Sequence, residues 1–110
     1  MAKIDFDNIF NTMLEAGKTE LGKNWKKAAD LATSSIRTLA QNTVDIQAMR
    51  IKGTITQEQA ILKMNLQKDS FKILMLSEKA FGLLMVEAAL NAIIDSVKAP
   101  INAALKFELL

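Results

Sequence analysis

The side chains best spaced for chemistry are two carboxylates, Glu87 and Asp95, with Asn91 between them. On a helix, steps of four residues place all three on one side. Two carboxylates facing one site can divide general acid and general base work. Because the sequence offers them no catalytic partner, we interpret these three residues and Lys98 as a polar stripe. Such a stripe would set the register between subunits or line a wet lumen.

The composition excludes many other kinds of site. The 110 residues include no His and no Cys, which removes the imidazole base, the thiolate nucleophile, the disulfide and the usual ligands of zinc and copper. The four glycines form no phosphate-binding loop, and no calcium-binding loop occurs. We therefore expect a protein that is not an enzyme and that has no cofactor and no bound metal.

The charge balance and the first residues bear on partners and location. Fourteen basic residues against twelve acidic ones leave a net charge of +2, which is too small for the field that non-specific nucleic-acid binding needs. Nucleic acid is therefore not an expected partner. Residues 1–8 contain no apolar run of the signal-peptide kind. We expect cytoplasmic synthesis without a signal peptide, with later incorporation into a virion or a secretion particle as one alternative.

Hydrophobic periodicity indicates an all-α chain. In residues 6–52 apolar side chains recur at steps of three and four, the pattern of an amphipathic helix. Asp5 is placed to cap its start. Gly17 and Gly22 interrupt the pattern, and we expect a kink or a split near Gly22.

The clearest boundary lies in the middle of the chain. Gly53 suits the left-handed position that follows the last turn of a helix. Thr56, followed three residues later by Gln59, forms a capping box, in which each side chain bonds to the backbone N–H of the other residue. The sequence therefore predicts a turn over 53–56, between a helix that ends near Lys52 and one that begins near Gln57.

The second half predicts one more long helix and a short tail. From residue 57 no Pro occurs before Pro100, which disfavours helical geometry at the preceding residue. We expect a helix over 57–98 and a tail over 99–110 with a short C-terminal helix. Two rods of similar length, joined by a short turn, form a long antiparallel helical hairpin in a single domain spanning 1–110. We expect the hairpin to pack in an oligomeric helical bundle.

The second helix is unusual because it is apolar nearly all round from residue 71 onward. One hairpin partner covers only one side of it, and a helix of this kind is normally buried by protein or lipid. Residues 41–70, near the turn, are expected to carry an ordinary polar surface. The predicted oligomer interface consists of the apolar side chains on the uncovered side: Ile73, Leu76, Leu83, Leu84, Leu90, Ile94 and Val97.

Three functions fit this pattern. The leading hypothesis is a non-enzymatic structural subunit that self-associates through the second helix, as a homo-oligomer or together with other subunits of a phage, secretion or other particle. The first alternative is a membrane-active protein that inserts residues 80–97 as an oligomeric pore or injection component, because this segment is long enough to cross a bilayer. The second is an adaptor that binds a different protein through the same face.

Overall fold

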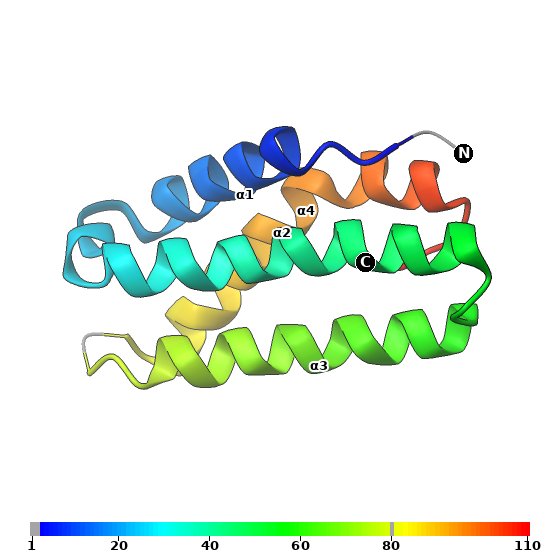
Figure 1. The fold of residues 1–110 in the computed structure, drawn as a ribbon. Coiled ribbons are helices and arrows are strands. Elements are labelled where there is room, and N and C mark those ends of the chain that lie inside the picture. The colour runs from blue at the N-terminus through cyan, green and yellow to red at the C-terminus, as the bar shows by residue number, and fades with distance from the viewer. Residues whose placement is uncertain (1–2, 80) are drawn as a thin grey trace.

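The structure, a computed structural model, describes residues 3–79 and 81–110. These residues form four α-helices and one short 3-10 helix, η1, and no strand occurs among them (Figure 1). The all-α class predicted from the periodicity is therefore confirmed. The elements in chain order are α1 (Phe6–Leu21), η1 (Gly22–Lys27), α2 (Ala29–Lys52), α3 (Gln57–Leu76) and α4 (Leu83–Leu105).

The four helices form a bundle in which successive helices run in opposite directions. α1 packs against α2 and α4, and α3 packs against the same two helices from the other side. α4 begins beside α3, crosses behind α2 and ends beside α1 (Figure 1). The described residues extend over 42 × 23 × 19 Å. α2 and α4 thus each contact the three other α-helices.

The predicted boundaries around the central turn are confirmed. Gly53 follows α2 with φ 73°, in the left-handed region, and its N–H donates to Arg50 O and Met49 O. At the start of α3, Gln59 N donates to Thr56 Oγ1 over 3.1 Å, and Thr56 N donates to Gln59 Oε1 over 2.9 Å. These bonds satisfy backbone groups that the two helix ends would otherwise leave without partners.

The helix expected over 6–52 is split, as the glycines near residue 22 suggested. α1 starts after Asp5, whose side chain accepts a hydrogen bond from Asp7 N, and it ends at Leu21. After η1 the chain reverses, and α2 runs back along α1. The reversal buries Met13 of α1 and Ile36 of α2 in one core. In a straight helix over 6–52 these two side chains would lie on separate turns and would not contact each other.

The single helix expected over 57–98 is wrong. α3 ends at Leu76, and α4, which begins at Leu83, runs back along α3. Phe81, between the two helices, is buried in the core, and its N–H donates to Glu78 O over 3.0 Å. Local sequence contains no strong breaker here apart from Gly82. The turn forms because folding back buries the apolar face of α4, a gain that exceeds the cost of ending a helix.

The helix end predicted before Pro100 is also wrong. α4 continues through Pro100 to Leu105, so the tail has no separate short helix. Pro100 is exposed, and the residue whose carbonyl loses its helical donor there, Ser96, is only half-buried, so water can take the place of the missing N–H. The chain leaves α4 at Lys106, where φ is 64°.

Both chain ends are fastened to the last turns of α2. Ile4 N donates to Gln47 Oε1 over 2.7 Å, although the two residues are 43 positions apart. The Arg50 guanidinium lies 5.5 Å from the centre of the Phe107 ring. Asn102 lies in the last turns of α4. Its Oδ1 accepts hydrogen bonds from the backbone N–H groups of Leu109 and Leu110, which follow the helix, over 2.9 and 3.1 Å. These contacts hold the terminal segments against the bundle.

Gly17 lets α1 approach α2 and α4 closely. A Cβ at this position would lie 3.0 Å from Ile36 Cδ1 on α2 and 3.4 Å from Ile93 Cδ1 on α4. Gly17 itself is buried. A larger side chain would therefore push two neighbouring helices away from α1.

We predict that Gly17→Leu destabilises the bundle by about 2–3 kcal/mol, because the added atoms overfill a packed core. Gly82→Ala is the matched control: a Cβ there meets nothing within 4 Å, and the expected change is below about 0.5 kcal/mol. Urea denaturation followed by circular dichroism measures both. Equal stability of Gly17→Leu and the native chain would contradict the close approach of the three helices.

Candidate interaction surface

The most distinctive surface feature is a row of exposed apolar side chains along α3. Leu62, Leu66, Ile73 and Leu76 have exposed fractions of 60%, 57%, 69% and 39%. Their spacing of four, seven and three residues places them on one side of the helix. We call these four residues the α3 outer face. Asp69, also exposed, lies on the same side between Leu66 and Ile73.

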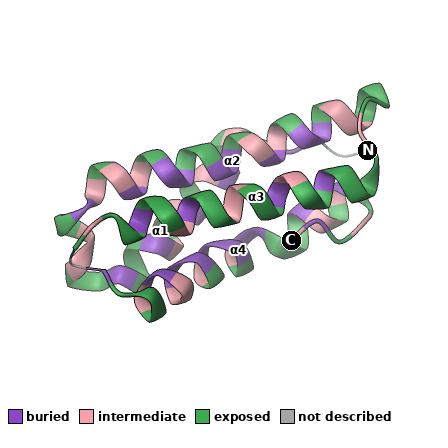
Figure 2. Ribbon diagram, turned by 90° about the horizontal axis from the view of Figure 1, so that it is seen from below, coloured by how far each residue is buried: buried purple, intermediate pink, exposed green. Residues whose placement is uncertain are grey.

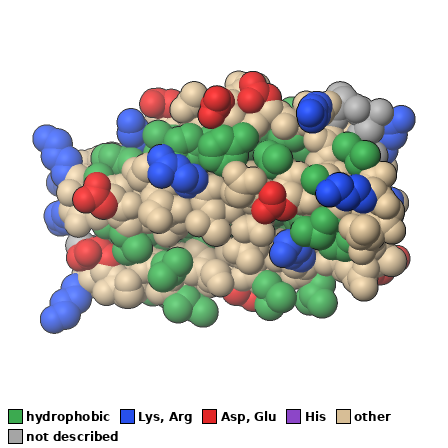
Figure 3. All heavy atoms as spheres, viewed as in Figure 1, with side chains coloured by type: hydrophobic (Ala, Val, Ile, Leu, Met, Phe, Trp, Pro, Cys, Tyr) green, Lys and Arg blue, Asp and Glu red, His purple; other side chains and the backbone are tan. Residues whose placement is uncertain are grey.

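α3 is therefore apolar on two opposite sides. Ala60, Met64, Phe71 and Met75 are buried and point into the bundle, while the α3 outer face points away from it. In the view from below, exposed residues recur along the whole of α3 (Figure 2). Apolar side chains also gather along the lower edge of the molecule, over α3 (Figure 3). Single exposed apolar residues are ordinary, but an aligned row is a feature of interaction sites.

A second exposed apolar group lies at the turn between α3 and α4. Leu83 and Leu84, the first residues of α4, have exposed fractions of 53% and 84%. We call this pair the α3–α4 corner. It lies at the end of the bundle where α3 finishes.

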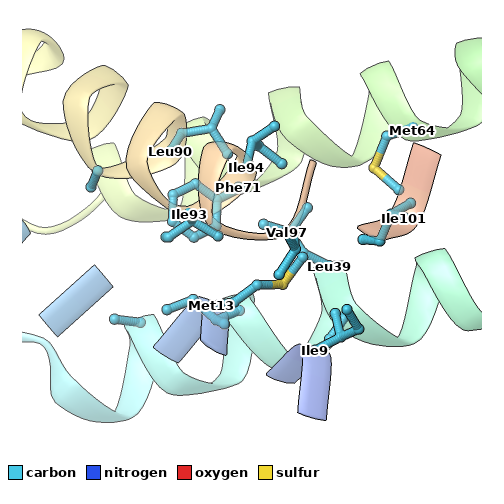
Figure 4. Packing of buried hydrophobic residues seen from close by; sticks show 14 of the residues in the cluster. Ile9, Met13, Leu39, Met64, Phe71, Leu90, Ile93, Ile94, Val97 and Ile101 are labelled. Carbon is cyan, nitrogen blue, oxygen red and sulfur yellow. The ribbon is translucent and has the colours of Figure 1, made fainter. Parts of the chain in front are cut away.

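The structure divides the predicted interface into two sets. Ile73, Leu76, Leu83 and Leu84 are exposed, as the prediction requires. For the remaining three residues the prediction is wrong, because they lie in the core of the single chain and point toward α1, α2 and α3 (Figure 4). The reason is that α4 has three neighbouring helices in the bundle, whereas the predicted hairpin would provide only one. The buried three are Leu90, Ile94 and Val97.

Leu62 and Leu66 were not predicted as surface residues of an interface, because residues 41–70 were expected to have an ordinary polar surface. Each of these leucines is two residues from a buried partner, Ala60 or Met64. Two residues on a helix differ by about 200° around its axis, so the leucines could not share the buried side. This two-residue spacing is the sequence signal from which the exposure of Leu62 and Leu66 could have been predicted.

The polar stripe of α4 faces solvent. Asn91, Asp95 and Lys98 are exposed and Glu87 is half-buried, so the arrangement is that of a solvated helix side. Nothing in the described residues pairs Glu87 with Asp95, and no group of three carboxylates there is able to hold a metal ion.

One charged group near this stripe is perturbed. Lys68 on α3 is partly buried, and desolvation, with a smaller contribution from the positive charge of Lys98, lowers its pKa below the ordinary 10.5. The folded chain therefore holds the Lys68 proton less tightly than the unfolded chain does. It follows that folding becomes more favourable as the pH rises from the lowered pKa toward 10.5.

One hollow in the surface does not resemble a catalytic cleft. It has a volume of about 230 Å³ and lies between the N-terminal segment and the last turns of α4. Its walls are mostly apolar, and the charged groups at it are one lysine and one aspartate. The lining residues are Lys3, Ile4, Asp5, Asn8, Ile9, Pro100, Ile101 and Ala104.

The segment predicted to insert into a bilayer, 80–97, lies mainly in α4. Among the residues that the structure describes, no helix has the length and apolar character required to span a bilayer. Ala80, the first residue of the segment predicted to insert, lies outside the described residues. Much of the remainder, 81–97, is core.

Comparisons of this chain with protein-family models, with curated proteins and with solved structures found no match. The exposed surface is therefore the feature of this protein that bears on its function.

We predict opposite outcomes for two leucines of α4. Leu90→Arg should destabilise the bundle by more than about 3 kcal/mol, because it places an unpaired charge in the core. Leu84→Arg should change the stability by less than about 0.5 kcal/mol, because this side chain is exposed. Thermal melts of both variants at a concentration where the chain is monomeric provide the measurement. A stable Leu90→Arg variant would show that α4 is not held in the core.

We also predict that Lys98→Glu stabilises the bundle at pH 7, because it replaces repulsion of Lys68 by attraction. The gain is about 0.5 kcal/mol or less for such a solvent-screened pair, or roughly 2 °C in the melting temperature. Lys23→Glu, at an exposed position in η1, is the control with the same change in net charge. The difference between the two variants should shrink in 1 M salt. Equal melting temperatures at low salt would contradict the proposed repulsion.

Proposed function

We infer that this protein is a non-enzymatic assembly subunit that associates with further copies of itself through the α3 outer face. The observation that carries this proposal is the apolar row Leu62, Leu66, Ile73 and Leu76, aligned on a helix whose opposite side already fills the core. Assembly through this row leaves the bundle intact, since none of these side chains belongs to the buried cluster. The particle that such a subunit builds would be a virion, secretion or other multi-subunit assembly.

The energetics support a weak contact through this face. Full burial of a Leu or Ile side chain contributes about 1.5–3 kcal/mol, so the exposed part of each residue in the row would contribute about 1 kcal/mol. Two copies together would gain about 8 kcal/mol, part of which is offset by the loss of translational and rotational freedom. A contact of this strength is concentration-dependent, which suits a subunit whose assembly is controlled by its local abundance.

The α3–α4 corner would supply a second contact. An interface that uses the same surface on both copies closes as a dimer, and a larger particle needs a further surface. Leu84 is the most exposed large apolar side chain described in the chain. The corner lies at the end of α3, so a subunit bound there would adjoin the α3 outer face.

The surface favours assembly over insertion into a bilayer. Leu90, Ile94 and Val97 fill the core, so insertion of this segment would require withdrawing α4 from three helices. An adaptor role would use the same exposed row, with a different protein in place of a second copy. The measurements below separate these functions by the mass of the pure chain.

We predict that the pure chain forms dimers or larger species at concentrations of about 0.1–1 mM, without detergent or lipid. Leu66→Arg should weaken this association by at least about tenfold, because it places a charge in the apolar row. Circular dichroism should show unchanged helicity, since Leu66 is exposed. Sedimentation equilibrium over this concentration range gives the masses.

Ala48→Arg is the matched control, because it adds the same charge at an exposed position on α2. It should leave the association unchanged. A chain that stays monomeric at 1 mM would overturn the assembly function. The exposed row would then be interpreted as the surface through which an adaptor binds a different protein. A Leu66→Arg variant that associates like the native chain would show that copies meet elsewhere.

A further inference from the structure

We propose that two copies pair through their α3 outer faces in antiparallel orientation, about a two-fold axis that passes close to Asp69. This inference rests on the assembly function proposed above and specifies the geometry of its contact. The occupant of the face is a second copy of the same chain. Three features of α3 carry the argument: the order of its apolar residues, the charges at its ends and the ion pair at its centre.

The α3 outer face has nearly the same order of residues in both directions. Leu62 and Leu66 lie seven and three residues before Asp69, and Ile73 and Leu76 lie four and seven residues after it. At about 1.5 Å per residue, reversing the helix about Asp69 superposes the two apolar pairs to within about 2 Å. Leu62 and Leu66 of one copy would then meet Leu76 and Ile73 of the other. A two-fold contact requires a surface that is complementary to itself in this way.

The charges at the two ends of α3 favour the antiparallel orientation over the parallel one. Glu58, in the first turn of α3, lies eleven residues before Asp69, and Lys79, in the turn that follows α3, lies ten residues after it. Both side chains are exposed. Antiparallel pairing brings Glu58 of each copy to the level of Lys79 of the other, so opposite charges meet at both ends. Parallel pairing would bring Glu58 to Glu58 and Lys79 to Lys79, which repel. Antiparallel helices also place their dipoles in opposition, which is favourable.

The centre of the face explains why the contact would be weak and specific. Asp69 Oδ1 lies 4.0 Å from Lys72 Nζ in the same chain. At the two-fold axis two such pairs would come together as a neutral group of four charges. The two Asp69 carboxylates would still be close and partly desolvated, which costs stability and fixes the register of the pair. Replacing Asp69 by an apolar residue would turn the face into an unbroken row.

Cross-linking tests the geometry directly, because the chain contains no Cys and an engineered one has no background. Under mild oxidation of single variants, Asp69→Cys should form a disulfide-linked dimer with itself. Leu62→Cys mixed with Leu76→Cys should form a mixed dimer at least about fivefold more than either variant alone, since a disulfide needs the two Cα atoms within about 7 Å. Ala48→Cys, on the exposed side of α2, reports the level of random collision.

A second measurement uses the strength of the association. The double variant Asp69→Leu with Lys72→Leu should tighten the dimer by about tenfold, because it replaces both partly desolvated ion pairs at the axis by apolar side chains. Asp45→Leu with Lys52→Leu is the matched control, since it removes one exposed acidic and one exposed basic side chain from α2; it should leave the dimer constant unchanged. Weaker association of the Asp69→Leu, Lys72→Leu variant would contradict a position at the axis.

The outcomes separate this inference from the function on which it rests. A native chain that is monomeric at 1 mM overturns the assembly function itself. A native dimer in which Leu62→Cys cross-links with itself as readily as in the mixture overturns only the antiparallel orientation, because that pattern marks parallel helices. A native dimer in which none of the three cysteines exceeds the Ala48→Cys level shows that the copies associate through another surface.

Discussion

Burial of α4 is the constraint on which the rest of the bundle depends, because no other helix of the chain is so apolar around its circumference. Eight of its residues are buried, and they face α1, α2 and α3. A single antiparallel neighbour could shelter only part of this surface. The split after Leu21 and the reversal between α3 and α4 give α4 its three neighbours, so both reversals follow from the same requirement.

In contrast to α4, α3 keeps one apolar side exposed in the folded chain. Its inner side packs against α2 and α4, while no helix within residues 3–79 and 81–110 covers the side that carries Leu62 and Ile73. The apolar excess that the sequence shows in its second half is therefore not removed by folding. Folding buries most of the apolar surface of α4, apart from Leu83 and Leu84, and leaves the outer side of α3 exposed. An exposed row of this kind on a folded domain is the ordinary basis of association between subunits.

The sequence predicted the features that depend on neighbouring residues and failed where distant contacts decide. The turn at Gly53 and the capping box of Thr56 are local, and both were predicted correctly. The turn before α4 depends on burying Phe81 against other helices, which no local pattern reports. The same contacts moved Leu90 from the expected interface into the core. Four of the six residues of the α3 outer face and the α3–α4 corner were predicted, because Ile73, Leu76, Leu83 and Leu84 lie outside the buried sides of their helices.

The attachment of both chain ends to α2 has a topological consequence. Ile4 bonds to Gln47, and Phe107 lies against Arg50 only three residues further along the same helix. The N-terminal and C-terminal segments thus both contact neighbouring turns of α2, so the backbone forms an almost closed loop. A peptide linker that joins the two terminal segments, together with new termini at 77–79, would give a circularly permuted chain that keeps the same core.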